Sequence, residues 1–135
     1  MLQPALPAEE ALCFLCLANM ARAEGDFAQS TLYYNKSLAQ HRLVGNPHHI
    51  ASSLNGLATS YSERGEFDQA HQQLKESLAL RRKIGDQKGI ATVLVNLGFI
   101  ALGQARYAEV KPLEQEALDI FREIEYPMGA AVAFE

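Results

Sequence analysis

Few residues in the chain stand at spacings that suggest chemistry. Cys13 and Cys16 form a C-x-x-C pair, a spacing found in redox and zinc sites, but no second cysteine pair accompanies them. They lie within a helical pattern, so we interpret both as small core residues. His48 and His49 are adjacent at a helix start, and one such pair does not make a metal site. The sequence contains neither a glycine-rich phosphate loop nor a nucleophile motif.

The charged residues have structural explanations of their own. The basic cluster at 81–83 ends a predicted helix, where positive side chains interact favourably with the helix dipole, although contact with an acidic partner is another interpretation. Most carboxylates are expected on the outer, solvated faces of helices. We therefore predict that the chain is not an enzyme and that it holds no cofactor and no metal ion.

The composition is that of a soluble, folded protein, with 135 residues, 48% of them hydrophobic, and a formal net charge of -4. Acidic and basic residues are mixed along the chain, which leaves no basic stripe for a nucleic-acid backbone. No apolar run approaches the roughly 18 residues of a membrane span. Residues 1–7 resemble a tail and not a signal peptide. We expect a cytoplasmic protein that contacts neither nucleic acid nor membrane.

The organising feature of the chain is a unit that returns about every 40 residues. One complete copy covers residues 90–125, and its apolar positions recur earlier: Leu97 corresponds to Leu57 and to Leu17. A fixed period of this length indicates stacked supersecondary units. We predict a single domain over 8–135, divided into repeats at about 8–47, 48–87 and 88–127 with a partial fourth at 128–135.

Each unit contains two stretches in which apolar residues recur at helical spacing. Glycine-containing breaks separate the stretches, and short loops make neighbouring helices antiparallel. Beyond the two helices of the first repeat, we expect helices at about 48–64, 67–84, 88–104 and 107–125.

The third repeat departs from the other two. Ala105 stands where they have a turn glycine, which predicts a slightly different or more frayed hairpin. Pro112 removes a backbone hydrogen bond early in the last helix and predicts a kink or a late helix start. Glu114 occupies a position at which the other repeats have a large apolar residue, and Leu113 is expected to fill the space of that side chain.

These positions resemble tetratricopeptide repeats. The second unit matches the family pattern at Leu54, Leu57-Ala58, Tyr61, Gly65, Phe67, Ala70, Leu74 and Ser77. The resemblance implies an all-α fold, a right-handed α-solenoid of antiparallel helix pairs. The long period is similar to that of kinesin light chains, of LGN-type adaptors and of the arrays C-terminal to the ATPase domains of bacterial signalling regulators.

The resemblance also implies a binding surface, because in this family the first helix of each pair lines a concave face that holds a peptide or a partner helix. Arg22 and Glu63 belong to this predicted lining. The candidate partner-binding residues are Asn19, Ser52, Asn55, Thr59, Ser62, Val95, Asn96, Phe99 and Leu102.

Two chemistries are expected on this face. Asn55 and Asn96 each offer a donor and an acceptor to the backbone of an extended peptide, or else are merely solvated helix residues. Val95, Phe99 and Leu102 form an apolar stripe, which either receives a partner side chain, packs against the following repeat or is buried by the superhelix.

Two functions therefore compete. The first is a scaffold that binds a protein or peptide in its concave groove. The alternative is a regulatory or sensor segment of a larger bacterial signalling ATPase or transcription regulator. Residues 130–134 look like the start of a fourth repeat, and an uncapped C-terminal face predicts either a homo-oligomer or a tail helix folded back on it.

Overall fold

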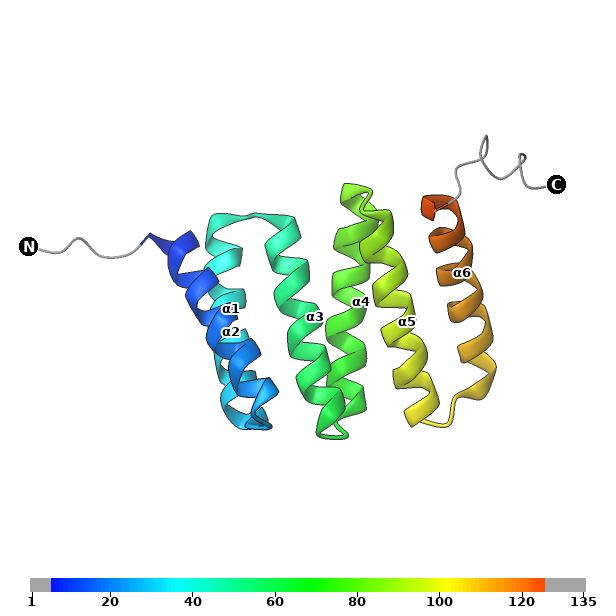
Figure 1. Ribbon diagram of the computed structural model, residues 1–135, viewed down its shortest axis with the longest axis horizontal. Helices are drawn as coiled ribbons and strands as arrows, with labels where there is room; N and C mark the ends of the chain where they lie inside the picture. Colours follow the sequence, from blue (N-terminus) through cyan, green and yellow to red (C-terminus); the bar gives the residue numbers. More distant parts are fainter. Residues whose placement is uncertain (1–5, 126–135) are drawn as a thin grey trace, which may run out of the picture.

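The computed structural model describes residues 6–125, and within this range the chain is entirely helices and short turns (Figure 1). No helix among these residues is long and apolar enough to cross a membrane. The helices are α1 (Pro7–Ala23), α2 (Phe27–Val44), α3 (Pro47–Glu63), α4 (Phe67–Ile84), α5 (Gln87–Gly103) and α6 (Tyr107–Glu125).

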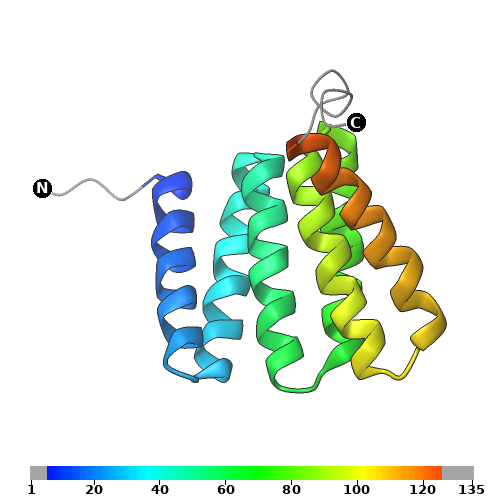
Figure 2. The same ribbon diagram turned by 45° about the vertical axis from the view of Figure 1, so that its right-hand side comes forward.

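Consecutive helices pack against each other along the chain. α1 pairs with α2, α3 with α4 and α5 with α6, and the hairpins join through contacts of α2 with α3 and of α4 with α5. Figures 1 and 2 show the resulting row of helices, in which chain order is also spatial order. This arrangement confirms the predicted all-α solenoid of antiparallel helix pairs.

Local sequence explains where the helices begin and end. Asp26, Asn46 and Asp86 each accept a hydrogen bond from a backbone N–H in the first turn of the following helix, which satisfies donors that lack an intrahelical partner. The glycines at 25, 45, 65 and 85 have φ between 72° and 81°, a left-handed conformation that glycine adopts without steric cost. The turn chemistry read from the sequence therefore sets the hairpins.

The third hairpin closes with the same turn, although it lacks the glycine. Ala105 has a φ of 59° at the position of Gly25 and Gly65. The N–H of Arg106 donates to the carbonyl of Ala101 at 2.8 Å, as the corresponding residues do in the other two hairpins. The expectation of fraying is wrong, because alanine accepts the strained conformation and keeps the turn hydrogen bonds. The hairpin is nevertheless slightly different: the N–H of Glu109 donates to the carbonyl of Arg106, three residues back, whereas the corresponding bonds of the other two hairpins span four residues.

The last helix contains Pro112 and nevertheless begins at Tyr107. The prediction of a late start is therefore wrong, while the predicted kink stays a prediction. Leu113 packs against two clusters of buried residues, whereas Glu114 is exposed. Leu113 thus supplies the apolar contact expected at this level of α6.

Two clusters of the hydrophobic core lie between consecutive hairpins, and a further one lies within the third hairpin. One cluster joins the first two hairpins and includes Tyr34 and Leu57, and the next joins the second and third hairpins and includes Leu74 and Ile100. Because each of these two clusters draws on two hairpins, burial of apolar surface stabilises the stacking of the hairpins as well as each helix pair.

Cys13 and Cys16 are exposed, so their assignment to the core is wrong. The residues that correspond to Cys13 in the second and third repeats are Ser53 and Val93, and both are completely buried. Ser53 is covered by the preceding helix, whose Ser37 hydroxyl lies 3.2 Å from its own. No helix precedes α1 among the described residues, and this exposes the corresponding face of α1.

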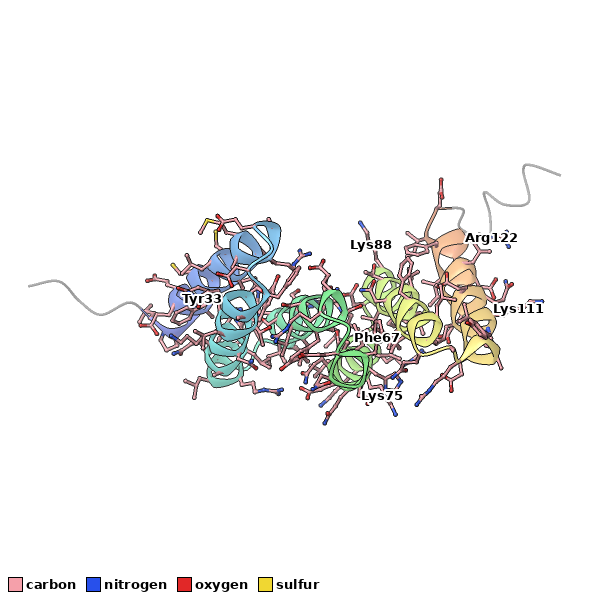
Figure 3. The ribbon with its side chains drawn as sticks, turned by 90° about the horizontal axis from the view of Figure 1, so that it is seen from below. Tyr33, Phe67, Lys75, Lys88, Lys111 and Arg122 are labelled. Carbon is pink, nitrogen blue, oxygen red and sulfur yellow. The ribbon has the colours of Figure 1, made fainter. Side chains whose placement is uncertain are left out.

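The far end of the row also carries apolar side chains. Tyr107, Leu118 and Ile124 on α6 are exposed, and Figure 3 shows Lys111 and Arg122 pointing outward from the same helix. Residues 126–135, with the expected start of a fourth repeat, lie outside the described residues. Self-association through this face stays a prediction, which a strictly monomeric light-scattering mass at high protein concentration would contradict.

Candidate functional site

A cavity of about 350 Å³ lies between α3 and α5, the first helices of the second and third hairpins. We call it the α3–α5 cavity. Four of the predicted partner-binding residues line it together: Thr59, Ser62, Asn96 and Phe99. Its remaining lining residues are Ala58, Glu63, Leu74 and Ile100.

The floor of the α3–α5 cavity is apolar and its walls are polar. Ala58, Leu74 and Ile100 belong to the core cluster between the hairpins and are almost completely buried. The Phe99 side chain is 64% exposed, so it does not pack against a following helix among the described residues. The cavity can therefore hold an apolar group below and polar groups at its walls.

Asn55 and Asn96 lie side by side across the two helices. Asn96 Nδ2 donates a hydrogen bond to Asn55 Oδ1 at 3.2 Å. Both side chains are half-buried. This bond uses one donor of Asn96 and one acceptor site of Asn55, and it leaves a donor on Asn55 and an acceptor on Asn96 for a ligand.

Asn19 is held in a separate network that reaches the same cavity. The buried hydroxyl of Tyr34 donates to Asn19 Oδ1, and Arg22 Nε donates to that hydroxyl at 3.2 Å. The Arg22 guanidinium in turn lies 3.5 Å from Glu63. The hydrogen bond with Tyr34, and beyond it the charge of Glu63, raises the pKa of Arg22 above its ordinary value.

The other predicted site residues do not line the α3–α5 cavity. Ser52 is exposed on α3. Val95 packs against the core cluster of the third hairpin, so the apolar stripe is divided between core and surface. Leu102 is 51% exposed, one turn beyond Phe99 on α5.

Sequence reasoning missed the part that Tyr34 plays. The repeat pattern predicts only a large packing residue at the position of Tyr34, equivalent to Leu74, and it gives no role to a hydroxyl there. A tyrosine at a fully buried position needs a hydrogen-bond partner for that hydroxyl, and this was the available signal. The partners, Asn19 and Arg22, could be found only by folding α1 against α2.

The histidines do not gather with other metal ligands. His41 and His49 stack with ring centroids 4.9 Å apart and an angle of 10° between their planes. Within residues 6–125, no group of three or more His, Cys, Asp or Glu residues is placed to hold a metal ion.

Comparison with known proteins agrees with this architecture. A tetratricopeptide repeat model matches residues 10–83, which is more than half of the chain. No curated protein matches. The chain is similar to the crystal structure of BtubC (BKLC) from P. vanneervenii, with a TM-score of 0.74 and 22% sequence identity over 83% of this chain and 46% of that one. At this identity the likeness concerns the fold, and the chain spans less than half of the length of BtubC.

The family is settled by the repeat model, by the helix pairs and by the turn and core residues that recur in each. The chain belongs to the tetratricopeptide repeat family.

Proposed function

We propose that this chain is a scaffold that holds an extended peptide segment of a partner protein on the concave face between α3 and α5. Tetratricopeptide repeats are generally protein-interaction scaffolds and typically non-catalytic. The observation that carries the proposal is the α3–α5 cavity, which brings together four predicted partner-binding residues, one of which, Asn96, is hydrogen-bonded to a fifth, Asn55.

The asparagine pair suits the backbone of a peptide. An extended peptide presents N–H and C=O groups at regular intervals, whatever its side chains are. The remaining donor of Asn55 and the remaining acceptor of Asn96 can bind one C=O and one N–H of such a chain. These two residues would then set the position of the peptide and not its sequence preference.

Phe99 provides the contact that depends on the partner's side chain. It is a large apolar residue, 64% exposed, at the edge of a cavity with an apolar floor. Aromatic residues next to a desolvated pocket often carry most of the affinity of an interface. Leu102, one turn further along α5, extends this apolar surface.

The test begins with peptides selected from a random display library on the unmodified chain and measured by fluorescence anisotropy. Phe99→Asp should weaken binding of the selected peptides by at least about tenfold, because it places a charge where an apolar contact forms. Leu43→Asp is the matched control, since Leu43 is a similarly exposed apolar residue on α2, outside the α3–α5 cavity.

If the two variants weaken the peptides equally, or if no peptide is enriched over a column without protein, the concave face is not the binding surface. Unchanged helical circular dichroism in both variants shows that neither change unfolds the chain. The alternative, a sensor segment of a larger signalling ATPase or transcription regulator, stays a prediction, as does a cytoplasmic location.

A further inference from the structure

The α3–α5 cavity contains one charged residue, Glu63, and this residue decides which side chain the cavity would accept. We propose that the cavity takes the basic side chain of a lysine or arginine from the bound peptide. The inference rests on the scaffold function proposed above and specifies the side chain that fits the cavity.

The shape and the chemistry of the cavity match a long side chain with a charged end. Lysine and arginine have aliphatic stems that pack on apolar surface while the charged group stays at the polar edge. Leu74 and Ile100 form an apolar floor for the stem. Thr59, Ser62 and Asn96 offer hydroxyl and amide oxygens to the N–H groups of the head.

Two groups would recognise the positive charge directly. The Glu63 carboxylate can accept charge-assisted hydrogen bonds, which are stronger than neutral ones. The exposed Phe99 ring offers its face to a cation, an attraction that adds to the carboxylate contact. An aliphatic side chain in the same place would take water away from Glu63 without giving it a partner, and this costs free energy.

The structure shows a guanidinium already beside this carboxylate. Arg22 lies 3.5 Å from Glu63, and about a third of each side chain is exposed. An exposed ion pair at this distance is weak, so a ligand cation can replace it. Arg22 also has a second partner in Tyr34, to which it donates at 3.2 Å, and it would keep that partner when the ligand binds.

The test uses blocked five-residue peptides of alanine and glycine that differ only in the central residue, which is arginine, lysine, methionine or glutamate. Each peptide is titrated into the ¹⁵N-labelled chain, and the amide shifts of Ser62, Asn96 and Phe99 are followed. We expect the arginine and lysine peptides to bind about tenfold more tightly than the methionine peptide, a difference typical of one charged hydrogen bond. The glutamate peptide should bind most weakly.

Three variants separate this inference from a general charge effect. Glu63→Gln should reduce the affinity for the arginine peptide to that for the methionine peptide. Arg22→Ala should strengthen binding of the arginine peptide, because it removes the internal competitor for Glu63. Glu66→Gln is the matched control and should change nothing, since Glu66 forms an equally long exposed pair with Arg64 outside the cavity.

The outcomes distinguish this inference from the proposed function. If the methionine peptide binds as well as the arginine peptide at the same amides, the groove binds peptides but the basic preference is wrong. If Arg22→Ala weakens binding while Glu63→Gln does not, the cavity recognises a different group and the inference is overturned. If no peptide shifts these amides, at any concentration up to solubility, both this inference and the concave groove fail.

Discussion

Asn96 Nδ2 donates a hydrogen bond to Asn55 Oδ1 at 3.2 Å, and this contact joins α5 to α3 across 41 residues of sequence. Both side chains are half-buried, and Asn96 lines the α3–α5 cavity, so water can replace the bond at little cost. A half-buried amide pair between two helices therefore contributes little to folding. Its position suits recognition of a peptide backbone.

The first prediction separates these two effects. Asn55→Ala and Asn96→Ala should each change the free energy of unfolding by less than about 1 kcal/mol, because a neutral hydrogen bond open to water contributes only that much. Each should nevertheless weaken selected peptides, whatever their sequence. Asn35→Ala is the matched control: Asn35 is exposed on α2 and donates to the carbonyl of Thr31 at 3.0 Å. Equal affinities for all three variants would show that the asparagine pair does not contact the ligand.

The second prediction concerns Ala105, which adopts a φ of 59° at a position where the other two hairpins have glycine. Left-handed conformation costs a non-glycine residue about 1 kcal/mol, so Ala105→Gly should stabilise the chain by roughly that amount. Gly65→Ala is the reciprocal control and should destabilise it by a similar amount. Urea unfolding monitored by circular dichroism measures both changes, and an Ala105→Gly variant less stable than the unmodified chain would contradict the account of this turn.

The third prediction compares two glycines in the middle of helices. A Cβ on Gly56 would lie 2.3 Å from the ring of Tyr34, whereas a Cβ on Gly98 would lie 2.3 Å from the end of the exposed Glu114 side chain. The Tyr34 ring is completely buried and hydrogen-bonded, so it cannot move aside, but Glu114 can.

Alanine should therefore have opposite effects at these two positions. Gly56→Ala should destabilise the chain by about 1–3 kcal/mol through overpacking. Gly98→Ala should be neutral or stabilise it by up to about 1 kcal/mol, since alanine favours helix and already stands at the corresponding positions 18 and 58. Thermal or urea unfolding gives the comparison, and similar values for both variants would show that Tyr34 does not limit the approach of α3.

Much of the fold could be predicted from the sequence because its information is local and is repeated. Period, helical spacing, caps and turn glycines each depend on neighbouring residues, and three copies reinforce one another. Errors arose where the outcome depends on an element that the pattern does not contain. Cys13 has the right register for a buried residue, but burial requires a helix on that side of α1.

The candidate site was predicted less completely for a related reason. Register places Thr59, Ser62, Asn96 and Phe99 on the first helices of their hairpins, and this was visible in the sequence. Register does not show which of them meet across two helices, or that Val95 turns toward the core instead. The link from Asn19 through Tyr34 to Arg22 required the packing of α1 on α2 and had no counterpart in the other repeats to reveal it.

The last prediction concerns pH and rests on His41. This residue is almost completely buried, its ring stacks on that of His49, and its Nε2 has no hydrogen-bond partner among the described residues. Burial, and then the nearby charge of His49, lowers the pKa of His41 below its ordinary value of 6.5. The folded chain therefore resists a proton that the unfolded chain accepts.

Stability should in consequence depend on pH in one direction. Above about 6.5 both states are neutral at His41 and the full stability is present, whereas below that value the unfolded state gains a proton first and stability falls. His41→Phe should remove most of this dependence between pH 7.5 and 5.5, a range of about one unit on either side of the ordinary pKa. Phenylalanine is chosen because it keeps the stacked ring and already stands at the corresponding position 121. Urea midpoints across that range test it, with exposed His48→Gln as the control that should retain the slope. If the midpoint of the unmodified chain does not fall with pH, or if His41→Phe falls as steeply, His41 is not the group that resists the proton.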